Sequence, residues 1–371
     1  MKILLLGGGL QGLSFGESLY KREGCELSVV TNSYDIKTSR FFKKVYEVHP
    51  SGYEVTLKEI LSKDDFDIIV PMGDTTVSFL SKHKEAIENR YHVKCAVIDQ
   101  SILSIVADKS HFMKFCVENR FPHPHTAVLL KDSLDIVAHE IGFPALIKPD
   151  FSVGARGITR VNTLEELQSQ YPRIYDKYGS CTLQEFIDNP DYYYNVMMYR
   201  DSQGNCNNNV VIKIVRMYPV KAGSSCCCIS VENSELVSLC KTVLDKLNWI
   251  GMADFDVLQR KDTMEYKIIE INPRVPASLR AAYISGVNFP EMIVRDAVGK
   301  PPMHYQYKPG KFMRYMGIDL LWFLKSPHRL SSSPSWFHFI GRNVYYQDIF
   351  FRDPSTWYSW LIVGLRKFIA H

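Results

Sequence analysis

The residues with the clearest chemical pattern lie in KIIEINPRVPASL, residues 267–279, where Glu270, Asn272 and Arg274 stand at intervals of two. In an extended strand such residues share one face, while the isoleucines between them point to the other. Pro273 removes a backbone donor and favours an extended residue before it, so we expect the strand to end there. An acid, an amide and a guanidinium in one row could hold a charged ligand, or they could form a solvated strand face.

The segment before this strand, GMADFDVLQRKDT, is predicted to pair with it as a hairpin. With the register centred on Thr263, Asp256 lies opposite Glu270 and Asp254 opposite Asn272, all on one face. Facing carboxylates repel each other, so a cation between them is the simplest source of stability. Hard oxygen ligands suit Mg²⁺ bound together with phosphates better than Zn²⁺, and Mn²⁺ is the alternative to Mg²⁺.

A second candidate site is the glycine-rich segment PDFSVGARG, which follows Lys148 at the end of the strand-like PALIK. It contains Ser152, Gly154 and Gly157. A glycine-rich loop exposes backbone N–H groups to phosphate oxygens, and a lysine nearby supplies the countercharge. Taken alone, a hairpin turn with a surface lysine explains the same residues.

The elements that must position these residues follow from the apolar runs along the chain. Residues 1–95 alternate strand-like and helix-like segments, which predicts a parallel sheet covered by helices. From Ala107 a new unit begins with a helix capped by Asp108, and short strands then predict a mostly antiparallel sheet with attached helices. Another helix is expected over residues 234–248. After Gly299 the chain becomes proline-rich and aromatic, which indicates a C-terminal extension.

Composition narrows the class of protein. The chain has 371 residues, 46% hydrophobic and 23% charged, which is enough for two or three domains with more than one core. Its net charge of +4 is spread along the chain rather than gathered in basic blocks, so no nucleic-acid partner is expected. Nine cysteines without framework spacing, and no secretory leader, favour reduced thiols in the cytoplasm.

Two other segments have two interpretations each. Cys226, Cys227 and Cys228 are consecutive, so in a strand they point to opposite faces and are better explained as small buried side chains than as a metal site. The tail TWYSWLIVGLRKFIAH, residues 356–371, combines tryptophans, a short apolar run and cations. A helix that docks on its own protein is the favoured interpretation, and contact with a membrane surface is the alternative.

Five segments, in this order and at this spacing, resemble the ATP-grasp superfamily, and more closely its carbamoyl-phosphate-synthase-like carboxylate ligases. They span about residues 108–299 and read DKSHFMKFCVENRFPHPHT, PALIKPDFSVGARGI, LQEFI, GMADFDVL and IIEINPRVPASLRAA. The resemblance implies a mixed α/β and α+β architecture, in which an ATP-grasp fold follows a Rossmann-like pre-ATP-grasp domain. The regions it implies are a pre-ATP-grasp domain at 1–95, an N-terminal lobe with the glycine-rich loop at 96–187, a C-terminal lobe with the metal site at 188–300, and a C-terminal extension at 301–371.

The resemblance also implies roles for individual residues in binding ATP and metal. The ATP phosphates would be bound by Lys109, Lys148 and the loop residues Ser152, Gly154 and Gly157. The adenine pocket would be lined by Glu185, Phe186 and Ile187. Magnesium would be held by Asp256, Glu270 and Asn272. The catalytic residues would be Lys148 and Arg274, with Arg274 steadying an acyl phosphate.

Contacts to the substrates are less specified by the resemblance. The candidates are Gly9, Gln11, Asp74, Ser278 and Arg280, although capping of the following helix is the favoured role of Asp74. The pattern also departs from the family. Ala155 stands where a small polar residue is frequent, and neither Asp188 nor Asp191 can be assigned to the ribose. The basic stretch of Lys213, Arg216 and Lys221 could reach a phosphate or a substrate, or it could be a solvated strand edge.

The implied reaction is ATP-dependent phosphorylation of a carboxylate, followed by attack of an amine, a thiol or a similar nucleophile on the acyl phosphate. The partners are then small-molecule carboxylates and amines, with homo-oligomerisation left open. One alternative is a nucleotide-binding protein without turnover that serves assembly of an envelope polymer. Another is an NAD-dependent dehydrogenase, because Gly7, Gly9 and Gly12 fit a dinucleotide fingerprint, but Thr31 and Asn32 stand where its acid is expected.

Overall fold

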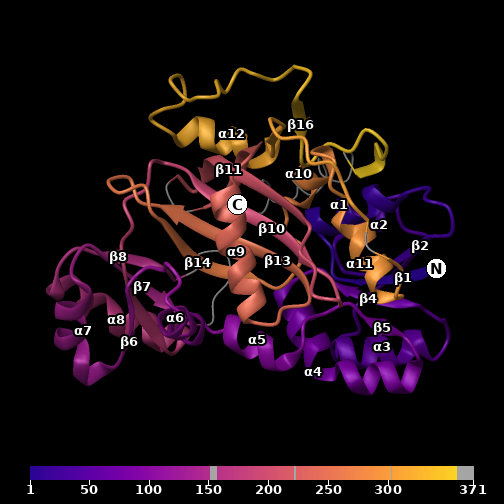
Figure 1. The fold of residues 1–371 in the computed structure, drawn as a ribbon, viewed down its shortest axis with the longest axis horizontal. Helices are drawn as coiled ribbons and strands as arrows, with labels where there is room; N and C mark the ends of the chain where they lie inside the picture. The colour runs from indigo at the N-terminus through magenta and orange to yellow at the C-terminus, as the bar shows by residue number, and fades with distance from the viewer. Residues whose placement is uncertain (151–156, 221–222, 302, 357–371) are drawn as a thin grey trace.

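The computed structural model describes residues 1–150, 157–220, 223–301 and 303–356 (Figure 1). The N-terminal part is a parallel sheet of five strands in the order β3-β2-β1-β4-β5, with helices packed against it, which confirms the predicted alternation. Its strands are β1 Lys2–Leu6, β2 Glu26–Val30, β3 Lys44–Tyr46, β4 Ile68–Pro71 and β5 Lys94–Cys95. Its helices are α1 Leu10–Leu19, α2 Tyr34–Lys37, α3 Tyr53–Leu61 and α4 Asp74–Tyr91.

Two helices connect this sheet to a small antiparallel one of order β6-β9-β7-β8, which lies at the opposite end of the molecule (Figure 1). The predicted cap of the second helix is confirmed, since the Asp108 carboxylate accepts hydrogen bonds from the backbone N–H groups of Ser110 and His111. The elements of this region are α5 Gln100–Val106, α6 Lys109–Glu118, β6 Thr126–Leu129, the 3₁₀ turn Lys131–Ser133, α7 Leu134–Ile141, β7 Ala145–Pro149, β8 Thr159–Val161, α8 Leu164–Tyr178 and β9 Cys181–Glu185.

The central layer is a sheet of seven strands in the order β14-β13-β10-β11-β12-β15-β16, antiparallel except for its last pair. The segment after Gly299 contributes β15 and β16 to this sheet, so it shares one sheet with the region before it. The elements are β10 Tyr193–Arg200, β11 Asn208–Tyr218, β12 Ser224–Val231, α9 Ser234–Lys246, β13 Gly251–Gln259, β14 Tyr266–Asn272, α10 Leu279–Ile284, α11 Phe289–Ala297, β15 Phe312–Arg314, α12 Met316–Lys325 and β16 Val344–Tyr346.

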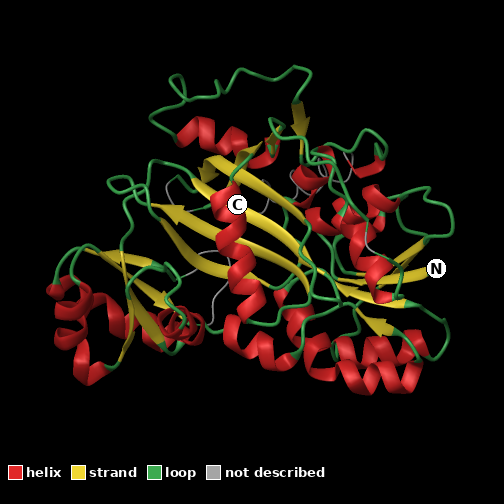
Figure 2. Ribbon diagram, in the orientation of Figure 1, coloured by secondary structure: helices red, strands yellow, loops and turns green. Residues whose placement is uncertain are grey.

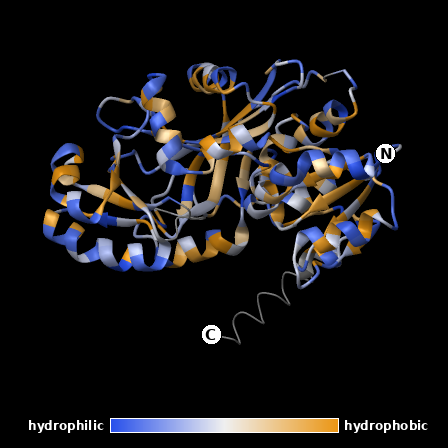
Figure 3. Ribbon diagram, turned by 90° about the horizontal axis from the view of Figure 1, so that it is seen from below, coloured by the Kyte–Doolittle hydropathy of each residue, from blue (hydrophilic) through white to orange (hydrophobic). Residues whose placement is uncertain are grey.

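One hydrophobic cluster joins the N-terminal sheet to the central sheet. It contains Leu5 and Phe15 of the first unit together with Met197, Ile212 and Phe289 of the second. The small sheet has a separate core, so it forms its own lobe. Figure 2 shows helices on the outside of the sheets, and Figure 3 shows apolar residues concentrated on the strands between them. The N-terminal unit and the central sheet are therefore held together by packing.

Buried ion pairs add to this packing. The Arg280 guanidinium bonds both carboxylate oxygens of Glu17 in α1 at 2.8 and 2.9 Å, and it also donates to the carbonyls of Tyr346 and Ile349. These bonds hold α10 to α1 and to residues 346–349, at the end of β16.

The nine cysteines are free thiols, and all are buried except Cys25, which is partly exposed. Cys226, Cys227 and Cys228 lie buried in β12, which confirms the prediction of small strand side chains. Within the described residues no helix is long and apolar enough to cross a membrane.

Candidate functional site

The hairpin predicted from the sequence is present, and its register at the polar end is the predicted one. Asp256 pairs with Glu270 and Asp254 with Asn272, on one face of β13 and β14. A bulge between Asp256 and Val257 shifts the rest of the hairpin by one residue, and β14 ends at Asn272 as expected. The four polar side chains therefore share one face.

Three carboxyl groups lie close together on this face, and removal from water shifts their pKa values. Burial raises the pKa of Asp256 well above its usual value, with the charge of Glu270 adding to the effect, and it raises the pKa of Asp254 to about 7. Burial acts to raise the pKa of Glu270 as well, but a hydrogen bond with Asp256 and the charges of Lys109, Lys148 and Arg274 hold it below its usual value. Two facing carboxyl groups that share a proton can exchange it for a cation, so the pair is a candidate cation-binding site.

One further polar residue, Asn195, completes the face and was missed by the sequence analysis. The Asn195 amide of β10 donates to Asp256, and one Asp254 carboxylate oxygen is buried without a hydrogen-bond partner. Asn195 interrupts the apolar side of YYYNVMMY at a period of two, which is a detectable pattern. Its neighbour in the sheet, however, is Asp256, 61 positions away, and no local pattern fixes that pairing.

Lys148 extends from β7 of the small lobe toward these acids. Its side chain is buried, and its ammonium donates to the Gln184 amide oxygen on β9 at 2.8 Å. Burial lowers its pKa to about 8, while the charge of Glu270 raises it and that of Lys109, the first residue of α6, lowers it. Lys148 of the small lobe and Lys109 of α6 therefore both lie within electrostatic reach of Glu270 on the hairpin.

The glycine-rich loop is described only in part, because Ser152 and Gly154 lie outside the described residues. Gly157 has φ +78°, and a Cβ there would come within 2.7 Å of the Tyr178 ring and 2.9 Å of Pro149 Cγ. A glycine is therefore required at position 157 by the backbone and by its neighbours, whether or not it meets a phosphate.

The three residues expected at the adenine lie where β9 ends. One carboxylate oxygen of Glu185 accepts the His125 N–H at 2.9 Å and the other pairs with Arg260. The Phe186 ring lies 4.1 Å from the Arg160 guanidinium, and Ile187 is buried. The Glu185 carboxylate is thus already engaged, so contact of its side chain with a nucleotide requires these bonds to rearrange.

Arg274 connects the acidic face to the N-terminal sheet. Its Nε donates to Asp74 Oδ1 at 2.6 Å, and its Nη2 donates to Asn272 Oδ1 at 3.2 Å. The favoured capping role of Asp74 is wrong. The residue that caps α4 is Gly73, and the Asp74 carboxylate faces an arginine 200 positions away instead.

The other substrate candidates fall into two groups. Gln11 Nε2 donates to the Met72 carbonyl at 2.8 Å, and Gly9 precedes α1 with φ +84°, so both lie at the edge of the parallel sheet that also carries Asp74. Arg280 is bonded to Glu17 and to backbone carbonyls, which supports a role in closing the fold rather than in binding substrate. Ser278 is buried at the start of α10, next to this network.

Neither interpretation of the basic stretch is right for Arg216. It is fully buried, and its Nε and Nη2 donate to the two carboxylate oxygens of Asp319 at 2.8 and 3.0 Å. The Lys213 ammonium lies 3.5 Å from the centre of the Tyr192 ring. Lys221 and Ala155 lie outside the described residues.

The donor set of the face fits a hard cation that is shared with phosphates. Among the described residues no three His, Cys, Asp or Glu side chains converge on one point, so a metal held by protein alone is not built there. Two carboxyls and an amide, with Asp254 close by, leave coordination positions for the oxygens of a bound nucleotide. Asp256, Glu270 and Asn272 thus fit Mg²⁺.

Comparison with known proteins identifies the same region. The family model described as carbamoyl-phosphate synthase L chain, ATP binding domain, matches residues 108–303. The D-aspartate ligase of Enterococcus faecium (strain Aus0004) is 24% identical over 82% of this chain and 76% of that protein. The carbamoyl phosphate synthase large chain of Clostridium perfringens (strain SM101 / Type A) is 25% identical over 80% of this chain, which spans only 30% of that relative's length.

Two solved structures share the fold. The biotin carboxylase domain of Hydrogenobacter thermophilus 2-oxoglutarate carboxylase, solved with MgADP, ADP and bicarbonate, aligns with a TM-score of 0.71 and 16% identity over 84% of this chain and 73% of that one. The L-amino acid ligase of Bacillus licheniformis aligns with a TM-score of 0.62 and 14% identity over 82% of this chain and 75% of that one.

Proposed function

The chain belongs to the ATP-grasp superfamily and is a ligase of its ADP-forming type, and from this premise we propose that it joins a carboxylate to an amine through an acyl phosphate. The match over residues 108–303 covers the lysines, the glycine-rich loop and the acidic hairpin. It leaves a nicotinamide dehydrogenase without support.

The proposed reaction has two steps with separate needs. A carboxylate oxygen of the first substrate attacks the γ-phosphorus of ATP, so that a P–O bond forms and ADP leaves. The amine then attacks the acyl carbon, inorganic phosphate leaves with the C–O electron pair, and the amine nitrogen loses a proton. Both steps depend on positioning and on neutralising oxyanions, because the reacting groups come from the substrates.

Each side chain has a proposed part in these steps. The ammonium of Lys148 binds a phosphate oxygen, which its proximity to Glu270 and Lys109 supports. The Arg274 guanidinium, fixed by Asp74 and Asn272, orients the acyl phosphate. Mg²⁺ held by Asp256, Glu270 and Asn272 would neutralise charge on the ATP phosphates, in keeping with the MgADP of the Hydrogenobacter thermophilus structure.

The observation that carries the proposal is the pairing of Asp256 with Glu270 inside a sheet, within the electrostatic reach of Lys148 from the other lobe. A facing acidic pair that is partly withdrawn from water is costly to keep in a fold. Its presence at the point where two lobes face each other supports a site that binds a cation and a polyanion together.

The substrate class is proposed from the relatives. D-aspartate ligase and L-amino acid ligase are named for amino acids, and we infer that one substrate of this chain is an amino acid. The edge formed by Gln11 and Asp74, next to Arg274, is the proposed place for the substrate that accepts the phosphate.

The test is ADP release from Mg-ATP with a crossed panel of carboxylic acids and amino acids. Glu270→Gln should reduce turnover at least a hundredfold, because the change removes an anion from the proposed metal site. Glu265→Gln, on the exposed turn of the same hairpin, is the matched control and should keep full activity. A folded Glu270→Gln enzyme with full turnover would remove Glu270 from the site, and no ADP release with any pair would favour a non-catalytic nucleotide-binding protein.

A further inference from the structure

Helix α12 is covered by the protein on one side and carries an exposed apolar strip on the other. Its inner side packs on β11 and β12 through Asp319 and Trp322, both buried. Its outer side carries Leu320, Leu321 and Leu324, which remain 47%, 41% and 59% exposed. An apolar helix face is ordinarily buried, so we expect a partner to cover the outer side.

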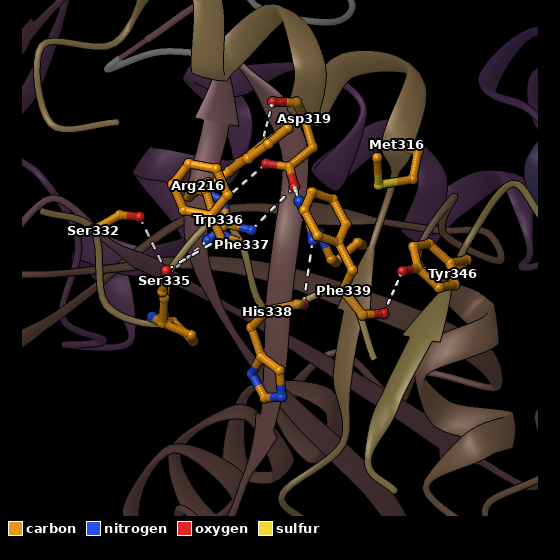
Figure 4. Close-up of polar contacts among 12 residues, drawn as sticks. Arg216, Met316, Asp319, Ser332, Ser335, Trp336, Phe337, His338, Phe339 and Tyr346 are labelled. Atoms are coloured by element: carbon orange, nitrogen blue, oxygen red, sulfur yellow. Dashed lines mark hydrogen bonds and ion pairs between the residues drawn. The ribbon is translucent and has the colours of Figure 1, made fainter. Parts of the chain in front are cut away.

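A buried network fixes which side faces outward (Figure 4). The Asp319 carboxylate accepts hydrogen bonds from Arg216 and from Nε of Arg314 at 2.8 Å, and the Asp319 carbonyl accepts the Trp336 indole N–H at 3.2 Å. The same two arginines donate to the carbonyls of Pro334 and His338 in the segment after the helix. Rotating α12 to bury its leucines would break ion pairs to a fully buried carboxylate, which is strongly unfavourable.

The segment after α12 extends the apolar surface. Phe337 is 58% exposed and contacts the Phe323 ring of α12 edge-on at 5.8 Å, while Trp336 stacks on Phe323 at 4.1 Å. Leu330 and Ile340 of this segment are 75% and 92% exposed. We name Leu320, Leu321, Leu324 and Phe337 the outer α12 face.

The charges of the chain segment that carries this face have one sign. From residue 320 to residue 346 the chain contains no aspartate or glutamate, whereas Lys325, Arg329 and Arg342 are exposed. Leucine, phenylalanine and tryptophan beside lysine and arginine are typical of segments that lie at the surface of an anionic bilayer. A second copy of the same face would instead bring these cations against one another.

We propose that the outer α12 face docks the protein on an anionic lipid bilayer, with its leucines and Phe337 at the headgroup boundary and the cations on lipid phosphates. The acidic hairpin lies at the β14 edge of the central sheet, whereas β15 and β16, next to α12, form the other edge. Docking therefore leaves the proposed ligase site away from the lipid, and the proposal is independent of the reaction.

Flotation of the full-length chain with phosphatidylglycerol–phosphatidylcholine vesicles tests this directly. The wild type should float with these vesicles and not with phosphatidylcholine alone, and rising salt should release it. Leu320→Ser with Leu324→Ser should lower the partition coefficient about tenfold or more. Lys325→Glu should lower it about fivefold or more. The matched control Ile136→Ser, at a residue 70% exposed on α7 of the small lobe, should have no effect.

Four results would overturn the proposal. The first is that the protein does not float with any vesicles, and the second is that it floats equally well with neutral vesicles. The third is that flotation is lost only when Trp357 and Trp360 of the tail are changed to serine. The fourth is a concentration-dependent dimer, seen by sedimentation velocity, that the leucine variant dissociates, because the occupant would then be a second copy. None of these readouts depends on turnover, so failure here is distinct from failure of the ligase assignment.

Discussion

Lys148 is subject to two opposing effects that its own sequence context does not reveal. Removal from water disfavours its charged form, and the nearby acids favour it. Burial is the larger effect, so its pKa falls to about 8, while the unfolded chain holds the proton up to about 10.5. Without a ligand this residue therefore adds stability as pH rises between these two values. A phosphate ligand would reverse the balance by favouring the ammonium form.

ATP affinity should therefore depend on pH. Above pH 8 Lys148 loses its proton, so each pH unit should raise the dissociation constant by up to about tenfold. Calorimetric titration with Mg-ATP between pH 8 and 9.5 measures this. Lys148→Met should bind more weakly and show a flat profile, and an unchanged slope in that variant would assign the titration to another group.

Asp74 was misread because its local context fits a cap, whereas its partner is distant in the sequence. An aspartate at the start of a helix is a frequent cap, and nothing in the sequence near position 74 points to Arg274. We predict that Asp74→Asn raises KM for the carboxylate substrate about tenfold and leaves KM for ATP unchanged, since it loosens the guanidinium alone. Asp65→Asn, at an exposed carboxylate of the same unit, is the control. Equal changes in both KM values would contradict a role specific to Arg274.

At the scale of elements, the sequence predicted the hairpin and the register of its polar end, but not the register next to the turn. A turn centred between alternating residues fixes which side chains share a face, and Asp256 faces Glu270 as predicted. The bulge after Asp256 and the pairing of β10 with β13 were not predictable, because they depend on packing between segments far apart. The helix that begins after Asp108 was likewise local, and its cap is present.

This cap gives an element-scale prediction. Asp108→Ala leaves two backbone N–H groups of α6 without their acceptor and should cost about 1 kcal/mol, within a range of roughly 0.5–2 kcal/mol. Asp99→Ala is the matched control, because Asp99 precedes α5 without a capping bond and its carboxylate pairs with Lys84 at the surface. Chemical denaturation followed by circular dichroism measures both. Equal losses in the two variants would show that the cap contributes nothing.

At the scale of the whole molecule, long-range ion pairs join segments that the sequence analysis assigned to separate regions. The region after Gly299 was expected as an extension, yet Arg216 of β11 and Arg314 of β15 meet at Asp319 of α12 in its interior. In the sequence such residues are isolated charges with no visible partner, because Asp319 lies about a hundred positions from Arg216. These charges come together in the core only when β11, β15 and α12 are packed in the folded protein.

The molecule-scale prediction concerns this cluster. Asp319→Ala leaves two buried arginines without a counter-charge and should lower the free energy of unfolding by about 3–5 kcal/mol. Glu47→Ala removes only a solvent-exposed ion pair with Lys37 and should leave the free energy of unfolding nearly unchanged. Urea denaturation compares the two. A loss below about 1 kcal/mol for Asp319→Ala would mean that water reaches the arginines.

The burial of the thiols makes the chain suited to chemical labelling. Eight of the nine cysteines are enclosed, and burial raises the pKa of Cys95 and Cys116 to about 12, which leaves almost no thiolate to react. Cys25 alone is partly exposed, on the turn before β2. A maleimide dye added to the native protein should therefore attach at one position, and it provides a ready fluorescent reporter of rotation and assembly without any engineered residue.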